Sequence, residues 1–153
     1  TGLSQYEAKE FIDRYFAAFT GIKRYMDDTV ALAKKQGHVE TLFGRRRYIP
    51  ELKASNLQLR NAGERMAINH PVQGTEADII KKAMIVVDAH IRRHWPEDVK
   101  MILQVHDELV FEVSENRAKA VAPKLQELMR DVVQLDVPID VDVGIGKSWG
   151  ETK

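Results

Sequence analysis

The order of apolar and polar residues predicts helices in the first part of the chain. Aromatic residues recur at helical spacing up to a break at Thr20 and Gly21, namely Tyr6, Phe11, Tyr15, Phe16 and Phe19. Ser4 followed by Glu7 has the form of a capping box, which marks the start of this helix. A second helix is expected over residues 22–35, with Gly37 as its left-handed C-cap. We expect the two helices to form a hairpin.

The middle of the chain alternates between β-prone and helical patterns. Residues 38–50 place β-favouring side chains on both sides of Gly44 and three arginines, which predicts a strand-turn-strand or an irregular loop with a basic tip. Helical spacing returns over residues 56–69, and Pro71 is expected to kink or end that helix because proline lacks the amide donor. Thr75 with Asp78 then has the form of a new helix cap, and Trp95-Pro96 ends the pattern.

The last third of the chain predicts a small sheet and one more helix. Apolar, β-prone runs at residues 101–105 and 109–113 flank a polar turn, which indicates an antiparallel hairpin with both strands largely buried. A helix, kinked or reset at Pro123, is expected over residues 115–132, and residues 137–143 alternate as a third strand. The predicted fold class is α+β: an antiparallel sheet of the hairpin plus a third strand, packed against long helices and preceded by a helical hairpin.

Composition narrows the class of protein without identifying it. The chain of 153 residues fits one domain, and 44% hydrophobic with 30% charged residues is typical of a globular protein. Lys plus Arg and Asp plus Glu are equal at 23 each, so any basic surface has to be local. The absence of cysteine excludes disulfides and thiolate metal sites and is compatible with a reducing cytoplasm.

The ends and apolar runs of the chain favour a cytoplasmic location with no membrane partner. No run approaches the roughly 18 apolar residues that cross a bilayer, and the first residues lack the layout of a signal peptide. The chain begins with Thr1 instead of Met, which suggests a segment cut from something longer or a processed product.

A carboxylate pair at the tip of the predicted hairpin is the first candidate for chemistry. In Gln104-Val105-His106-Asp107-Glu108 the polar residues emerge together at one end of the sheet. Adjacent Asp and Glu favour a hard cation such as Mg²⁺, and phosphoryl transfer is one natural use of such a site. Ordinary turn chemistry explains Asp107 equally well when the hairpin is taken alone, although it explains Glu108 less readily.

A polar stripe on the predicted middle helix is the second candidate. Arg65 and Asn69 are four residues apart, and Gln73 lies near the same line if Pro71 only bends the path. Purine N3 and pyrimidine O2 are minor-groove acceptors in every base pair, so donors here could check pair shape without reading sequence. For an arbitrary helix, a polar face that simply meets water is the commoner explanation.

These motifs, in this order and spacing, resemble family A (DNA polymerase I-like) DNA polymerases. The resemblance rests on the hairpin at residues 104–108, on Glu64 to Thr75, and on Gly44-Arg45-Arg46-Arg47-Tyr48-Ile49-Pro50. It continues through Ala77 to Met84 and to Trp149, although the family more often has a small residue where Glu76 stands. It implies that residues 1–51 are the remainder of the fingers subdomain and residues 52–153 the C-terminal part of the palm.

The resemblance also implies an activity, its cofactor and its partners. The family's enzymes are DNA-directed DNA polymerases of replication and repair, which add deoxynucleotides to a primer 3′ end by two-Mg²⁺ phosphoryl transfer. Asp107 would be a ligand of the catalytic metals and Glu108 the neighbouring catalytic carboxylate. The implied primer-template contacts are Arg65, Asn69, Gln73 and His106, and the possible phosphate contacts are Arg45, Arg46 and Arg47. Partners would be primer-template DNA, deoxynucleoside triphosphates and the upstream part of the polymerase.

The chain departs from the family by what it lacks. In the family, a second metal-binding aspartate and the lysine, arginine and tyrosine that grip the nucleotide lie in earlier motifs, for which we find no counterpart after Thr1. We therefore expect the isolated chain to be inactive. The alternative is a non-catalytic DNA-binding or subunit module that uses the arginine turn and the stripe from Arg65 to Gln73. An unrelated Mg²⁺ enzyme that uses Asp107 and Glu108 alone is disfavoured by the surrounding sequence.

Overall fold

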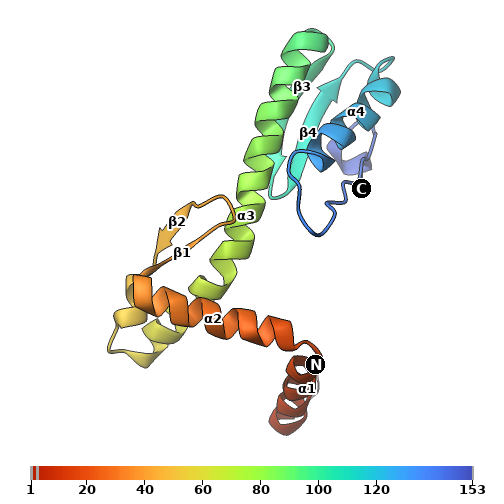
Figure 1. The fold of residues 1–153 in the computed structure, drawn as a ribbon. Helices are drawn as coiled ribbons and strands as arrows, with labels where there is room; N and C mark the ends of the chain where they lie inside the picture. Colours follow the sequence, from red (N-terminus) through yellow and green to blue (C-terminus); the bar gives the residue numbers. More distant parts are fainter. Residues whose placement is uncertain (1, 3, 153) are drawn as a thin grey trace. The chain divides into compact units, whose positions relative to one another are not determined.

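The structure, a computed structural model, describes residues 2 and 4–152 and divides into two compact units. The N-terminal unit is Thr1–Thr75 and the C-terminal unit is Glu76–Lys153. Figure 1 shows the order of the helices and strands along the chain. No described helix combines the length and the apolar character that a membrane span requires.

The first helix begins and the second ends where the sequence predicts, but the break between them lies at Phe19, because Thr20 and Gly21 already belong to the second helix. Helix α1 (Gln5–Ala18) starts at a complete capping box, in which Ser4 Oγ accepts from the Glu7 amide at 3.3 Å and the Ser4 amide donates to Glu7 Oε2 at 2.8 Å. Helix α2 (Thr20–Gln36) ends at Gly37, whose φ of 79° is the left-handed C-cap. The Gly37 amide donates to the Ala33 carbonyl at 2.8 Å.

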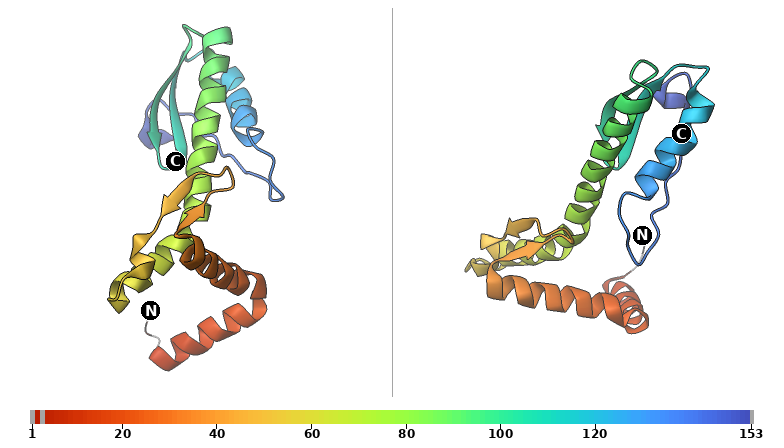
Figure 2. Two further views of the ribbon diagram at one scale, coloured as in Figure 1. Left: turned by 60° about the vertical axis from the view of Figure 1, so that its left-hand side comes forward. Right: turned by 45° about the horizontal axis from the view of Figure 1, so that its top comes forward.

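The prediction that these helices form a hairpin is wrong. Phe19 alone joins them, as C-cap of α1 and N-cap of α2, and the two helices diverge from this corner in both views of Figure 2. Antiparallel helices are usually joined by about two to five residues, so a one-residue link is too short for the reversal. None of the residues of α1, all of which are described, is buried.

A small antiparallel hairpin follows, as predicted for residues 38–50. Strand β1 (His38–Glu40) pairs with β2 (Arg46–Tyr48), and Gly44 in the connecting turn has a φ of 81°. A 3₁₀ helix (Pro50–Lys53) comes next. The core of the N-terminal unit is the cluster of Ala33, Val39, Ile49, Leu52 and Ala67. It packs α2, the hairpin and the first half of the next helix together.

Helix α3 (Leu57–His94) continues through Pro71, so of the two expected outcomes, a kink or an end, the end does not occur. It begins at Asn56, whose Oδ1 accepts from the amides of Gln58 at 2.8 Å and Leu59 at 3.2 Å. Thr75 does not cap a new helix, because its hydroxyl donates to the Pro71 carbonyl at 2.5 Å. Proline removes a single amide donor, and the packed helix tolerates that loss in its interior.

The C-terminal unit is built on the predicted β-hairpin. Strand β3 (Val99–Val105) pairs antiparallel with β4 (Glu108–Val113), with a register shift between Met101 and Leu103. Helix α4 (Ala118–Arg130) contains Pro123 without interruption, so the expected reset there does not occur. The core cluster is Val87, Ile91, Val99, Val121 and Leu125, and Figure 1 shows α3, the hairpin and α4 that contribute it.

Two details of the predicted sheet are wrong, while the α+β class is confirmed. The strands are not largely buried: Ile102 is 56% and Leu103 45% exposed, because only one sheet face packs on the core through Met101, Phe111 and Val113. Residues 137–143, all of them described, form no third strand. The Val141 carbonyl accepts from Gln126 Nε2 at 2.5 Å, so this segment is bonded to α4 and has no strand partner for a ladder.

Candidate functional site

The turn between β3 and β4 consists of His106 and Asp107, because Val105 and Glu108 are already paired across the strands. His106 has a φ of 53°, and it is the sole non-glycine residue with a positive φ in the described part of the chain. This conformation costs an L-residue about 1–2 kcal/mol. Gln104 Nε2 donates to the His106 carbonyl at 2.9 Å, which stabilises the strained turn.

Both carboxylates of the turn are open to solvent. Asp107 and Glu108 are exposed, and neither carboxylate makes a hydrogen bond or ion pair with any residue that the structure describes. Such oxygens are suitable ligands for Mg²⁺. Within residues 2 and 4–152, however, no cluster of three or more His, Cys, Asp or Glu side chains could hold a metal ion. The turn therefore offers two open carboxylates and, within the described residues, not a complete metal site.

The polar stripe on α3 lies in the N-terminal unit. Because the helix is continuous through Pro71, Arg65, Asn69 and Gln73 follow one another at intervals of four residues on one face. All three side chains are exposed, and none forms a hydrogen bond or ion pair within the described residues. The structure thus brings these three together, whereas His106, Asp107 and Glu108 belong to the C-terminal unit.

The three arginines of the β1–β2 hairpin have different partners. Arg45 Nη2 donates to the Gly74 carbonyl at 2.7 Å. Arg46 Nε contacts Glu40 Oε1 at 2.7 Å, and this hydrogen bond lowers the pKa of Glu40 and raises that of Arg46. Arg47 Nη2 lies 3.7 Å from Met66 Sδ, which is a weak acceptor. The three arginines therefore differ in how readily their guanidinium groups could bind a phosphate.

Sequence patterns did not identify Tyr25, which supports the polar stripe from α2. Its hydroxyl donates to the Ile68 carbonyl at 3.0 Å, next to Asn69, and partial burial raises the pKa of the phenol. Lys34 of the same helix forms an ion pair with Glu64 of α3 at 2.7 Å. Both contacts join residues at least thirty positions apart, so no local pattern indicates them.

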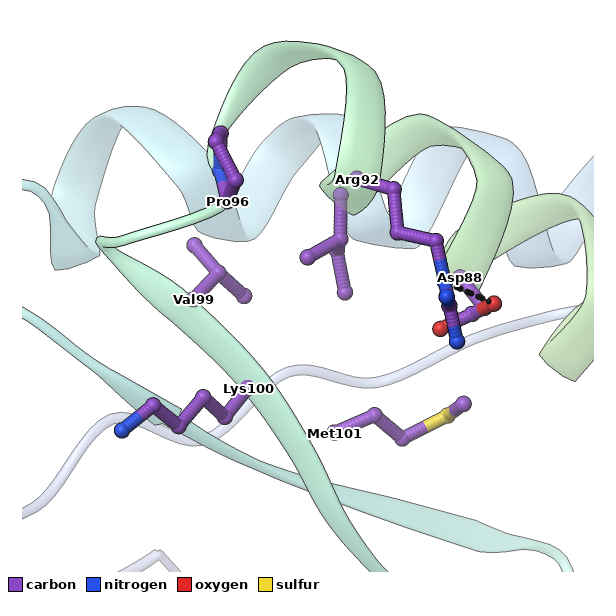
Figure 3. A pocket seen from close by; sticks show the side chains of 7 residues that line it. Asp88, Arg92, Pro96, Val99, Lys100 and Met101 are labelled. Atoms are coloured by element: carbon purple, nitrogen blue, oxygen red, sulfur yellow. Dashed lines mark hydrogen bonds and ion pairs between the residues drawn. The ribbon is translucent and has the colours of Figure 1, made fainter.

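A shallow pocket of about 320 Å³ lies elsewhere in the C-terminal unit, at the start of β3. Figure 3 shows its lining side chains, among them Arg92 paired with Asp88 at 2.8 Å and the backbone neighbours Lys100 and Met101. His106 follows the opposite end of β3, and none of the residues predicted to form a site lines the pocket. The pocket is separate from the carboxylate turn.

The comparison with protein families identifies the class to which this chain belongs. The model of the DNA polymerase family A matches residues 1–151. The chain belongs to this family.

Individual relatives are bacterial polymerases and are much longer. The chain is 49% identical over 150 residues to DNA polymerase I of Pseudomonas aeruginosa and 46% identical over 147 residues to the thermostable DNA polymerase I of Thermus aquaticus. These matches cover 98% and 96% of the chain but 16% and 17% of the relatives. A solved structure of the POL domain of Pol1 from M. smegmatis, in complex with DNA primer-template and dNTP, matches 98% of the chain and 26% of its own with a TM-score of 0.92 and 47% identity.

Proposed function

We propose that the chain contributes to a template-directed DNA polymerase that extends a primer 3′ end with deoxynucleotides. The observation that supports this most directly is the pair of exposed, unbonded carboxylates, Asp107 and Glu108, on a tight turn of a family A chain. The relatives are polymerases, and the solved relative binds primer-template DNA and dNTP. The chain spans about a sixth of those relatives, so the activity belongs to the complete protein.

Each site residue then has a defined task. Asp107 would hold catalytic Mg²⁺, which supplies charge stabilisation for attack of the primer 3′-hydroxyl on the α-phosphate. Glu108 is the neighbouring carboxylate, and His106 contacts the DNA near the primer terminus. Arg65, Asn69 and Gln73 donate to minor-groove acceptors that every correct base pair presents. Their unbonded donors support this role.

Among the three arginines, we assign the phosphate contact to Arg47. Arg46 is paired with a carboxylate and Arg45 with a helix carbonyl, whereas Arg47 donates weakly to a sulfur atom. An exposed guanidinium suits a phosphate, and its contribution to binding falls as salt rises.

Substitution of Asp107 in the complete polymerase tests the metal role. We expect Asp107→Ala to lower the rate of single-nucleotide incorporation on the order of 10³-fold or more, since metal stabilisation of charge is worth several kcal/mol. Primer-template affinity should change little. Glu112→Ala is the matched control, because Glu112 is an exposed carboxylate on the same hairpin outside the turn. Unchanged turnover of Asp107→Ala would remove Asp107 from the metal site.

The chain by itself should show little or no polymerase activity. Within the described residues Asp107 has no cluster of partner ligands, and a two-metal site needs more than one carboxylate. Primer extension by the purified chain, with Mg²⁺ and all four nucleotides, is the measurement. Extended product that survives in the wild-type chain and disappears in Asp107→Ala would contradict this expectation.

The second candidate function is a non-catalytic DNA-binding or subunit module. The exposed stripe of Arg65, Asn69 and Gln73, which has no bonded partner in the described chain, is the observation in its favour. It predicts salt-dependent duplex binding by the chain. Adding the upstream part of a family A polymerase separates the two candidates, because restored synthesis supports the catalytic role and its absence supports the module.

A further inference from the structure

The tip of the β1–β2 hairpin is bonded to α3 next to Gln73. The Leu42 amide donates to Thr75 Oγ1 at 3.0 Å, and Arg45 Nη2 donates to the Gly74 carbonyl at 2.7 Å. Thr75 Oγ1 in turn donates to the Pro71 carbonyl at 2.5 Å. We call these residues, Thr41, Leu42, Arg45, Gly74 and Thr75, the hairpin–helix junction. All of them belong to the N-terminal unit.

The junction is closely packed as well as hydrogen-bonded. Thr41 and Thr75 are 5% and 6% exposed, although both are polar. A Cβ atom at Gly74 would lie 2.7 Å from Thr41 Cγ2 and 3.0 Å from His70 Cε1, so a methyl group does not fit there without movement. Glycine at position 74 therefore permits the close approach of the hairpin to the helix.

Hydrogen bonds between Thr41 and the Arg45 backbone close the turn from which the Arg45 side chain extends. Thr41 Oγ1 accepts from the Arg45 amide at 3.2 Å, and the Thr41 amide donates to the Arg45 carbonyl at 3.0 Å. The intervening turn is closed at Gly44, whose amide donates to the Thr41 carbonyl at 3.0 Å. Arg45 thus reaches α3 from a rigid turn, and the ordering cost of its long side chain is reduced.

Helix α3 lacks a backbone hydrogen bond close to the place where the β1–β2 hairpin is bonded to it. Pro71 has no amide to donate to the Ala67 carbonyl, so α3 lacks one backbone hydrogen bond in the turn that precedes Gln73. A helix with a missing bond bends and opens more readily. The side chain of Gln73 is exposed and makes no hydrogen bond with the described residues. Its direction therefore depends on the backbone at residues 73 and 74.

We propose that Arg45 is a positioning residue: through the Gly74 carbonyl it fixes the backbone of Gln73 and so aims the Gln73 side chain at the minor groove of the primer-template. The inference rests on the proposed function, because Gln73 is given a DNA contact there. It reassigns Arg45 from the group of possible phosphate contacts and leaves that role to Arg47.

The two roles of an arginine differ in their dependence on salt. A phosphate contact contributes to counterion release, so its loss lowers the slope of log affinity against log salt by about one. A positioning arginine makes no phosphate contact, so its loss leaves the slope unchanged. We expect an unchanged slope for Arg45→Met and a slope lowered by about one for Arg47→Met, measured in the complete polymerase on one primer-template.

Kinetic coupling to Gln73 provides the second measurement. Loss of a charged hydrogen bond is worth on the order of tenfold to a hundredfold, and we expect Arg45→Met to lower the incorporation rate at saturating nucleotide by about tenfold. The double variant Arg45→Met with Gln73→Ala should be no slower than Gln73→Ala alone, because Arg45 acts through Gln73. Arg45→Lys should recover part of the rate, since an ammonium can still donate to the Gly74 carbonyl. Additive losses, or a reduced salt slope for Arg45→Met, would overturn the proposal.

A measurement on the chain itself separates this inference from the proposed function. NMR amide spectra of the chain should show shifts and faster hydrogen exchange at Gln73 and Gly74 in Arg45→Met, while amides near the start of α3 at Asn56 remain as in the wild type. Gly74→Ala, which leaves Arg45 intact but displaces Thr41, should perturb the same amides. Unchanged Gln73 and Gly74 amides in Arg45→Met would refute the positioning role even if the polymerase assignment holds. Perturbed amides with normal polymerase kinetics would confine Arg45 to a structural role and also reject the proposal.

Discussion

His106 has the least favourable backbone conformation of the candidate site residues, and it stands next to the carboxylate to which we assign the metal. A positive φ at a non-glycine residue costs about 1–2 kcal/mol, and such strain persists where neighbouring bonds over-determine it. The paired strands on both sides and the bond from Gln104 Nε2 to the His106 carbonyl supply that constraint. Glycine would adopt this backbone conformation at a lower cost than His106 does.

Substitutions at His106 should reveal the cost of its backbone conformation. His106→Gly removes the strain but adds about 0.5–1 kcal/mol of chain entropy, so the free energy of unfolding of the chain should change by less than about 1 kcal/mol. His106→Val should lower it by about 1–2 kcal/mol, because a β-branched side chain tolerates a positive φ poorly. Urea titration followed by circular dichroism is the measurement. Equal losses in both variants would show that the turn does not impose this φ.

Among single residues, the sequence points to Asp107, Glu108 and the stripe from Arg65 to Gln73, which the structure leaves exposed and whose roles stay predictions. It does not indicate the difference among the arginines. The cluster of Arg45, Arg46 and Arg47 is visible as a pattern, whereas the partners of Arg45 and Arg47 lie 29 and 19 positions away. Glu40, the ion-pair partner of Arg46, lies six positions away in the sequence. A role that depends on a partner distant in sequence can be recognised only in the folded structure. The hydrogen bond from Tyr25 to the Ile68 carbonyl is another example.

At the scale of elements, local signals succeeded where the bonds are local. The capping box at Ser4, the C-cap at Gly37 and the β3–β4 turn all rest on neighbours within a few positions. The prediction of a third strand was wrong, because alternation of apolar and polar residues predicts an extended backbone but does not supply a neighbouring strand to pair with it. A helix end at Pro71 does not occur, because packing on both sides of one missing hydrogen bond can keep a helix continuous.

Replacement of Pro71 distinguishes a continuous α3 from two successive helices. In a continuous helix Pro71→Ala restores the amide donor to the Ala67 carbonyl, so the free energy of unfolding should rise by about 1–3 kcal/mol. At the start of a new helix proline is favoured, and its replacement would be neutral or destabilising. Pro123→Ala in α4 is the matched control for a second interior proline and should also stabilise. A destabilised Pro71→Ala beside a stabilised Pro123→Ala would indicate a helix boundary at residue 71.

The start of α1 should respond to acid. Hydrogen bonds from the Ser4 amide and hydroxyl hold the pKa of Glu7 below its ordinary value. Because the folded pKa is depressed, the stabilisation is complete above the ordinary glutamate pKa of about 4.3 and is lost as the pH falls through the lower folded value. The Ser4 amide shift and hydrogen exchange in the first turn of α1, followed by NMR, should therefore change only in acid. Glu7→Gln should abolish this transition, and a transition that persists in Glu7→Gln would assign it to another group.

At the scale of the whole molecule, several large apolar side chains of the described residues are exposed, and some of them gather on α1. Phe11 is 67% and Ile12 50% exposed on α1, and these two residues line an apolar hollow with Tyr15 and Phe16. Contiguous apolar surface of this kind marks an interaction site or drives association. The hollow lies on α1, all of whose residues are described and none of whose residues is buried.

The purified chain should therefore self-associate, and the hollow on α1 should be the cause. Its average sedimentation coefficient should rise across a series of increasing chain concentrations, because burial of each large apolar side chain between copies is worth about 1.5–3 kcal/mol. Replacing both Phe11→Ser and Ile12→Gln should reduce this rise without loss of helical circular dichroism, since both side chains already face water. Val137→Ser is the matched control, because Val137 is 72% exposed but lies outside the hollow, and it should associate like the wild type. Equal association of the wild type and both variants would place the contact on another surface. A wild-type chain that stays monomeric at every concentration would show that the exposed apolar side chains of α1 attract one another too weakly to bring copies together.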